Sequence, residues 1–322
     1  MKLAHRKKSG RYYIGKCEEV LKDRKLKDIR GKVNLILTSP PFPLNNKKSY
    51  GNMTGEAYLR WFTSLAPLFS EMLADNGSIV IELGNAWEPK RPVQSLLPLQ
   101  SLLGFVSHER ADLRLIQQFV CYNPSRLPSP AQWVTIKQIR AVDSYTNVWW
   151  MAKSDFPKAD NSRPEVLRPY SASMKNLLKS GKFNSGKRPS HHKISENGFL
   201  NDRGGSIAQN FLELESLTPG REPRLPNAFS MSNAVSNDFF SRQCRDRGIE
   251  PHPARMQVGL AKFFIEYLTE PEDLVLDPFG GSNTTGYAAA LCGRKWLTIE
   301  EKESYVEQSQ IRFEDPALTY KK

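Results

Sequence analysis

The segment Ser39-Pro40-Pro41-Phe42 combines groups that could hold and activate an amino group. Two successive prolines fix two φ angles and remove two N–H groups, so the carbonyl groups of Ser39 and Pro40 should point outward from a rigid turn. A hydroxyl and a carbonyl together can accept both N–H donors of an exocyclic amino group, and Phe42 offers a ring face on which a flipped-out base could stack. A Pro-Pro turn is also common in ordinary loops, so this motif alone leaves both interpretations open.

A second segment, residues 277–284, has the composition of a nucleotide-binding turn. It lies between an apolar run and an Ala-rich run. Glycines at a strand-to-helix turn let the backbone approach a ligand, and the helix N-terminus supplies free N–H donors. Glu300 follows about twenty residues later, where a carboxylate could accept hydrogen bonds from ribose hydroxyls. The full Gly-x-Gly-x-x-Gly spacing is missing, so an ordinary tight turn with a surface glutamate is the alternative. The residues are Asp277, Pro278, Phe279, Gly280, Gly281, Ser282, Asn283 and Thr284.

The stretches around both segments alternate between strand and helix patterns. Residues 33–38 are apolar enough to be buried on both faces of a sheet, and Asn76-Gly77 predicts a turn into a strand at 78–83. Such alternation predicts a mostly parallel sheet covered on both sides by helices. The other expected strands are 11–15, 113–122, 147–152, 274–277 and 295–299. The expected helices are 56–73, 93–103, 259–268, 287–291 and a final helix through Arg312.

Residues 154–250 differ from both flanks, because periodicity fades and Ser, Asn, Gly and Pro dominate. Between Lys175 and Arg203, seven Lys or Arg stand against two Asp or Glu, with His and Phe interleaved. Such a segment is either disordered or a recognition region held by its ligand, and we favour the second because compact enzymes seldom keep long structureless loops. We therefore expect a catalytic half at 1–153, a target-recognition insertion at 154–250 and the cofactor-binding half of the same catalytic domain at 251–322.

Composition narrows the class of protein and its partners. The 322 residues suffice for one substantial core plus a smaller domain or insertion. The formal net charge of +12 favours nucleic acid as the partner, although a basic balance also serves solubility. No stretch approaches the roughly 18 apolar residues that span a bilayer, so we expect an unsecreted, cytoplasmic protein without membrane association. The four cysteines lack metal-ligand spacing and disulfide density, so we expect reduced thiols and no metal site.

Taken together, the two motifs resemble those of the amino-group DNA methyltransferases. The catalytic motif of that family is Asp, Asn or Ser followed by Pro-Pro and an aromatic residue, and its cofactor motif contains Phe-x-Gly. The serine form found here resembles the cytosine-N4 branch, and a catalytic motif that precedes the cofactor motif is typical of the circularly permuted beta class. Further segments resemble the PvuII type of cytosine-N4 methyltransferase over most of the chain: Lys47-Lys48-Ser49-Tyr50-Gly51, Asn123-Pro124-Ser125-Arg126-Leu127-Pro128-Ser129-Pro130, Asn147-Val148-Trp149-Trp150, Gly204-Gly205-Ser206-Ile207, His252-Pro253-Ala254-Arg255 and Gly280-Gly281-Ser282-Asn283-Thr284-Thr285-Gly286.

The resemblance implies a fold, an activity and a cofactor. The fold would be α/β, with a mostly parallel, circularly permuted, Rossmann-like methyltransferase sheet and an inserted target-recognition region. The activity would be site-specific transfer of a methyl group from S-adenosylmethionine to cytosine N4 in duplex DNA, within a restriction-modification system. The family usually has Gly-Asp after the first strand, whereas Gly15 is followed here by Lys16, so backbone or another residue must contact the adenine of the cofactor.

The same resemblance assigns roles to individual residues. The implied catalytic residues are Ser39, Pro40, Pro41 and Phe42. Besides the glycine-rich segment and Glu300, the implied cofactor-binding residues are Thr38, His252 and Pro253. Target reading is expected of 154–250 and of the Pro-rich loop 123–133, where cations would contact phosphates and Arg, Asn or Gln would read base edges; a solvated surface is the alternative for each residue. The DNA-binding candidates are Lys47, Lys48, Ser125, Arg126, Lys187, Arg188, His191, Gln209 and Asn210.

The expected reaction needs no covalent enzyme intermediate. The amino nitrogen attacks the sulfonium methyl in line, positioning supplies much of the acceleration, and Ser39 with the Pro40 carbonyl stabilises the charge that develops on nitrogen. Carbon-5 cytosine methylation uses a Pro-Cys nucleophile, and no cysteine here follows a proline. The open alternatives are an adenine-N6, an RNA or a protein-glutamine methyltransferase, and a non-catalytic DNA-binding module. We also expect a nucleoid-associated monomer or weak dimer, with a restriction endonuclease as a genetic partner only.

Overall fold

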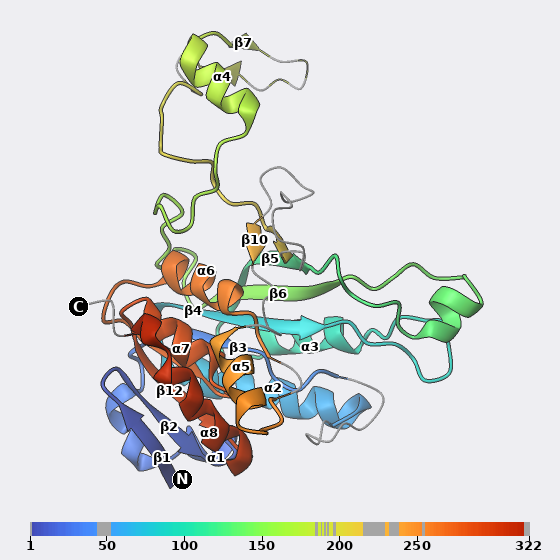
Figure 1. Ribbon diagram of the computed structural model, residues 1–322, viewed down its shortest axis with the longest axis vertical. Coiled ribbons are helices and arrows are strands. Elements are labelled where there is room, and N and C mark those ends of the chain that lie inside the picture. Colours follow the sequence, from blue (N-terminus) through green and yellow to red (C-terminus); the bar gives the residue numbers. More distant parts are fainter. Residues whose placement is uncertain are drawn as a thin grey trace.

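A ten-stranded sheet forms the centre of the molecule (Figure 1). The computed structural model describes residues 2–43, 53–183, 186–187, 189, 191, 193–195, 198–214, 229–231, 238–252 and 255–318. The strand order is β1-β2-β12-β11-β3-β4-β6-β5-β9-β10. The strands are β1 (Lys2–Lys7), β2 (Gly10–Ile14), β3 (Val33–Thr38), β4 (Leu73–Gly84), β5 (Arg114–Tyr122), β6 (Tyr145–Ala152), β9 (Phe211–Leu214), β10 (Phe229–Met231), β11 (Leu274–Asp277) and β12 (Lys295–Glu300).

Five neighbouring strands, β2, β12, β11, β3 and β4, run parallel, so their carboxyl ends meet at one edge of the sheet. Strand β11 pairs directly with β3, with Val275 opposite Leu35 and Leu276 opposite Ile36. The turn that follows β3 and the glycine bend that follows β11 therefore lie at adjacent strand ends. This confirms the expected α/β fold with a mostly parallel sheet, and it brings together motifs from opposite ends of the chain.

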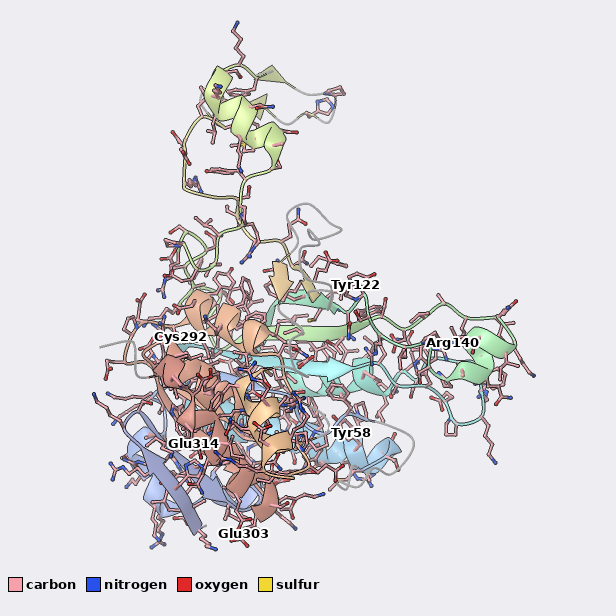
Figure 2. The ribbon with its side chains drawn as sticks, in the orientation of Figure 1. Tyr58, Tyr122, Arg140, Cys292, Glu303 and Glu314 are labelled. Atoms are coloured by element: carbon pink, nitrogen blue, oxygen red, sulfur yellow. The ribbon has the colours of Figure 1, made fainter. Side chains whose placement is uncertain are left out.

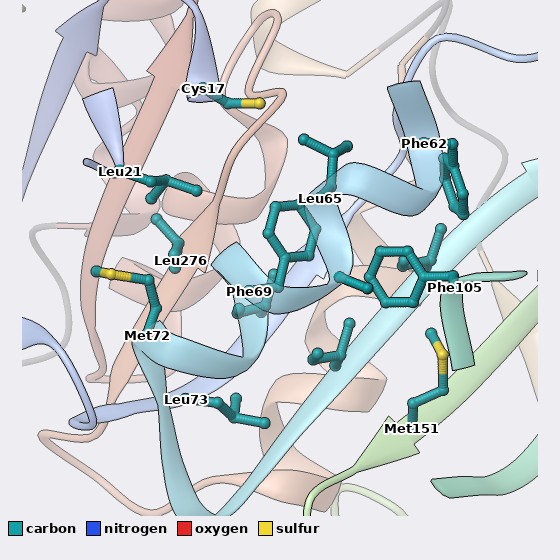
Figure 3. Packing of buried hydrophobic residues seen from close by; sticks show 14 of the residues in the cluster. Cys17, Leu21, Phe62, Leu65, Phe69, Met72, Leu73, Phe105, Met151 and Leu276 are labelled. Atoms are coloured by element: carbon teal, nitrogen blue, oxygen red, sulfur yellow. The ribbon is translucent and has the colours of Figure 1, made fainter. Parts of the chain in front are cut away.

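Helices cover both faces of this sheet, and alternate residues of each strand point to opposite layers. Ile36 packs with one buried cluster, whereas Leu35 and Leu37 pack with the other. The first cluster contains Phe69 and Phe105 from two helices, which lie against the sheet in Figure 3. The helices are α1 (Cys17–Val20), α2 (Gly55–Met72), α3 (Leu97–Val106), α4 (Ala172–Ser180), α5 (Phe239–Asp246), α6 (Val258–Leu268), α7 (Thr284–Leu291) and α8 (Glu303–Ser309), with short 3-10 turns at Arg24–Ile29 and Gln310–Glu314.

Two features of the sheet differ from the prediction. Strand β4 begins at Leu73, before the predicted turn, because Asn76-Gly77 lie in an irregularity of the β3–β4 ladder rather than between two elements. The predicted turn was therefore wrong, since a bulge absorbs the extra residues without ending the strand. Strand β1 was not predicted, because its basic residues carry no apolar alternation and it pairs only with β2 at the sheet edge.

The middle of the chain contributes to two separate places. Strands β9 and β10 extend the main sheet beyond β5. Helix α4 and a short hairpin, β7 (Gly186–Lys187) and β8 (Lys193–Ile194), form a lobe that projects away from the sheet (Figure 1). The segment expected to form the insertion, residues 154–250, thus contains both strands of the main sheet and a projecting lobe. Within the described ranges, no helix combines the length and apolar character needed to cross a membrane.

Candidate active site

A buried hydrogen bond links the ends of β3 and β11. The Thr38 hydroxyl donates to Asp277 Oδ1 over 2.7 Å, and the Phe279 backbone N–H donates to the same oxygen over 3.0 Å. Burial raises the pKa of Asp277 to about 6, while the hydrogen bonds from Thr38 and the backbone of Phe279 oppose the rise. The carboxylate therefore fixes the Pro-Pro turn and the glycine bend relative to one another.

The Pro-Pro turn lies on the end of the neighbouring strand β4. Pro40 is buried, and Ser39, Pro41 and Phe42 are half-buried. The ring of Phe42 packs so closely over Gly84 that a Cβ added at Gly84 would lie 2.5 Å from Phe42 Cδ2. Only glycine leaves room for the ring in this position, so the last residue of β4 provides the seat for the predicted stacking residue.

Glu82, near the end of β4, is a site residue that the sequence analysis missed. Its carboxylate accepts a hydrogen bond from the Thr146 hydroxyl at 3.0 Å, and the Ser39 hydroxyl lies close enough to act on its pKa. Burial raises the pKa of Glu82, and the Thr146 and Ser39 hydroxyls and the charge of Arg126 oppose the rise. A serine hydroxyl has two acceptor lone pairs besides its one donor, so Ser39 can accept from an amino group while its own proton is directed to Glu82. Glu82 is the single acid in the predicted strand 78–83, and this was the available sequence signal.

Arg126, predicted to bind DNA, lies close to this catalytic end. Its guanidinium donates to the Tyr145 carbonyl oxygen over 3.1 Å, and its charge lowers the pKa of Glu82. The loop that carries it continues into an arm that extends beyond the sheet and bears Arg140 (Figure 2). The structure thus brings one candidate from the Pro-rich loop next to the catalytic motif. Neighbouring Ser125 is exposed, and its N–H donates to the Asn123 side chain.

The glycine bend after β11 forms a tight cradle. Gly281 has a φ of +49°, and the Tyr12 hydroxyl donates to its carbonyl oxygen over 2.6 Å. A Cβ added at Gly280 would overlap the Thr298 side chain. Glycine is therefore required at 280 for space and favoured at 281 for its left-handed backbone. The other members, Pro278, Ser282 and Thr284, are buried around the cradle.

Asn283 closes the cradle and caps α7. It has a φ of +59°, and its Oδ1 accepts from the Gly286 N–H at 3.1 Å and from the Thr298 hydroxyl at 2.8 Å. Its Nδ2 is buried, with no hydrogen-bond partner among the described residues. An unsatisfied buried donor beside a glycine cradle fits a site that is completed by a polar ligand.

Glu300 and His252 lie on the flanks of this cradle. The Glu300 carboxylate accepts from the N–H groups of Gly281 and Lys302, each at 2.9 Å, and burial raises its pKa. An ionised carboxylate has about four acceptor positions, so the two bonds leave capacity for ribose hydroxyls. The ring of His252 lies next to Gly281. The exposed Lys16 follows Gly15, whose N–H donates to the Glu300 carbonyl oxygen, so the departure from Gly-Asp lies at this side of the site.

Arg312 supports the cradle from behind, and the sequence analysis gave it no role. Its side chain is 3% exposed, with Nε donating to the Ser282 carbonyl oxygen at 2.7 Å and Nη2 donating to Ser282 Oγ at 3.1 Å. Burial lowers its pKa to about 10, and the charge of Asp238 opposes the change. The guanidinium also lies over the Phe240 ring of α5. No spacing rule links residues 282 and 312, so only the fold reveals this contact.

The remaining DNA-binding candidates do not gather on one described surface. His191 is exposed in the α4 lobe, whereas Gln209 and Asn210 are exposed at the start of β9, where the Asn210 side chain donates to the Gln118 carbonyl oxygen. Trp149 and Trp150 are buried in the core. Lys47, Lys48, Arg188, Pro253 and the side chain of Lys187 lie outside the described residues.

Comparisons with known proteins agree with this geometry. The model of a DNA methylase family matches residues 33–311. The type II methyltransferase M.PvuII from Proteus hauseri is 38% identical over 100% of this chain and 88% of its own length. The solved structure of PvuII DNA methyltransferase (cytosine-N4-specific) matches with a TM-score of 0.72 and 33% identity, covering 98% of this chain and 90% of that chain. An M1.HpyAVI–SAM complex shares the fold at a TM-score of 0.50 and 18% identity, covering 94% and 99% of the two chains.

Proposed function

The chain belongs to this DNA methylase family, and from that premise we propose that it transfers a methyl group from S-adenosylmethionine to cytosine N4 in duplex DNA. The observation that carries the proposal is the hydrogen bond between Thr38 and Asp277. It holds a turn suited to binding an amino group next to a cradle suited to a nucleoside cofactor. A flipped base and a methyl donor placed at these two strand ends would meet.

The described residues fit S-adenosylmethionine as the methyl donor. The cradle at Gly280 and Gly281 has no room for side chains, which permits a ligand to approach the backbone. The Nδ2 group of Asn283 offers an unused donor, and Glu300 offers acceptors for ribose hydroxyls. His252 lies against the cradle and completes the proposed binding set. When bound, this cofactor supplies an electrophilic methyl group.

The catalytic turn would orient the amino group and remove its proton. The Ser39 oxygen and the Pro40 carbonyl accept the two amino N–H groups, which increases electron density on the nitrogen and directs its lone pair to the methyl carbon. Methyl transfer would form the new N–C bond, break the methyl–sulfur bond of the donor with its electron pair going to sulfur, and leave an acidic nitrogen. Its proton passes to Ser39 while the Ser39 hydroxyl proton passes to Glu82, so the charge developing on nitrogen is neutralised.

Cytosine N4 is favoured over adenine N6 by a relative that matches along nearly the whole chain. PvuII DNA methyltransferase is cytosine-N4-specific and matches nearly the whole chain. By contrast, DNA adenine methyltransferase YhdJ from Escherichia coli (strain K12) is 40% identical over only 20% of this chain. We further propose that residues 154–250 recognise the target sequence, that the protein acts in the cytoplasm as a nucleoid-associated monomer or weak dimer, and that a restriction endonuclease accompanies it genetically.

The test is to identify the methylated nucleoside. Purified protein is incubated with S-adenosylmethionine and duplex DNA, and the DNA is digested to nucleosides for mass spectrometry. The proposal predicts N4-methylcytosine in the digest. N6-methyladenine would overturn the proposal in favour of the adenine-N6 alternative. Ser39→Ala should abolish methylation and retain DNA affinity. DNA binding without any methylated nucleoside, with parent and variant alike, would support a non-catalytic DNA-binding module.

A further inference from the structure

Helix α4 is well capped but buries no side chain. Ser171 Oγ accepts from the Met174 N–H at 3.2 Å at its N-terminus, and Gly181 ends the helix with a φ of +63°. None of its nine residues is buried. Short helices in water are marginal without tertiary packing, so a helix with defined ends and little buried surface is suited to binding a partner.

Four of the six exposed residues of α4 form one stripe. Exposed Ala172, Lys175, Asn176 and Lys179 follow the spacing i, i+3, i+4 and i+7, which places them on the same helix face. The opposite face is half-buried, through Met174, Leu177 and Leu178. The stripe therefore combines two cations, one amide and one small residue on the exposed side of the helix.

The charge and position of the lobe identify duplex DNA as the occupant of this stripe. From Tyr170 to Gly204 the sequence has seven Lys or Arg and two Asp or Glu, a net charge of +5. The lobe projects from the sheet, and its side chains stand clear of the core (Figures 1 and 2). An α-helix fits the major groove, and lysines at its rim neutralise phosphates. We infer that α4 is the groove-reading helix of this enzyme, an inference that rests on the proposed function.

The residue types on the stripe assign separate roles. Lys175 and Lys179 lie one turn apart, so they can contact phosphates along one strand and contribute affinity without sequence preference. Asn176 lies between them, and an asparagine amide pairs bidentately with the N6 and N7 edge of adenine. The small side chain of Ala172 allows the helix to approach the bases. Asn176 is therefore assigned as a specificity-determining residue for an A·T pair in the target.

The first test measures DNA affinity as a function of salt. Lys175→Gln and Lys179→Gln should each reduce the slope of log K against log salt by about 1, whatever the DNA sequence. Lys25→Gln is the charge-matched control, because exposed Lys25 lies in the 3-10 turn Arg24–Ile29 outside the lobe. Unchanged slopes for both α4 variants would overturn the placement of the helix in a groove.

The second test selects bound sequences from a randomised duplex library. Asn176→Ala should relax preference about tenfold to a hundredfold at one A·T position, and exposed Ser173→Ala, on the same helix but off the stripe, should leave the preference unchanged. Far-ultraviolet circular dichroism checks that the variants fold. Identical selected sites for parent and Asn176→Ala would overturn the assignment. The selection measures binding and not methylation, so it tests the role of α4 even if the parent protein does not methylate DNA. Failure to methylate would count against the proposed function alone.

Discussion

Glu82 is placed to accept the proton released when the amino group is methylated. A general base contributes about a hundredfold to ten-thousandfold to a rate, so Glu82→Gln should lower kcat by at least about a hundredfold. Gln retains an acceptor for the Ser39 hydroxyl but cannot take a proton at neutral pH. Single-turnover methylation of duplex DNA, with cofactor binding measured in parallel, separates this loss from a loss of affinity.

The pH dependence of the same variant gives an independent readout. The base must be ionised, so the parent rate should fall as pH falls through the pKa of Glu82, which burial raises above its ordinary value. Glu82→Gln should show a low rate without this acidic limb. An identical acidic limb in both proteins would show that Glu82 has no role in proton transfer.

The buried Asp277 carboxylate should lower the free energy of unfolding at neutral pH, although it organises the site. Its folded pKa of about 6 exceeds the unfolded value of 3.8. Its contribution to stability is therefore fully present below the unfolded pKa and is lost as pH rises through the folded pKa. Asp277→Asn keeps an oxygen for Thr38 and Phe279, so it should raise the unfolding free energy by about 3 kcal/mol at pH 8 and only about 1 kcal/mol at pH 4.5. Denaturant unfolding at both pH values tests this difference, and an equal effect at both would contradict it.

At the level of elements, sequence patterns located the strands that carry the site. Strand β3 was predicted with its observed bounds, and so was β11, because buried parallel strands are short apolar runs with clear turn signals at their ends. Helix α4 and strands β9 and β10 were missed. Their residues are polar or only partly buried, so they lack the periodicity on which prediction depends.

The contacts that complete the site could not be predicted in the same way. Glu82 lies near Ser39 because β4 lies beside β3, and Arg312 meets Ser282 although they are thirty positions apart in the chain. Pairing of strands and packing of helices decide such contacts, and neither leaves a fixed spacing in the sequence. The motifs themselves were visible because their residues are contiguous, whereas the residues that support them are not.

The end of β4 should control the position of Phe42. The methyl group added by Gly84→Ala would overlap the Phe42 ring. Overpacking of this kind lowers the free energy of unfolding by about 1–3 kcal/mol. We expect lower unfolding free energy together with loss of methylation, because the displaced ring no longer stacks on the base. The double variant Gly84→Ala with Phe42→Leu should recover stability but not activity. If the double variant recovers neither stability nor activity, or recovers both, the Phe42 ring and Gly84 are not coupled in this way.

At the scale of the whole molecule, the site joins two distant parts of the chain. Strand β11 lies between β12 and β3, so the C-terminal segment fills the middle of the sheet rather than an edge. The cofactor cradle comes from the C-terminal part and the catalytic turn from the N-terminal part, and Thr38 connects them through Asp277. Neither part can present a complete site alone, so ligand binding and folding of the sheet should be coupled.

This coupling predicts that S-adenosylmethionine stabilises the entire sheet. At a concentration one hundred times its Kd, it should add about 2.7 kcal/mol and raise Tm by roughly 4 °C in one cooperative transition. Ser39→Ala should keep the full shift, because Ser39 faces the amino group. Asn283→Asp keeps the cap acceptor and replaces the free Nδ2 donor, so it should reduce the shift. Calorimetry with a circular dichroism melt tests both, and a shift that only Ser39→Ala removes would place the cofactor outside the glycine cradle.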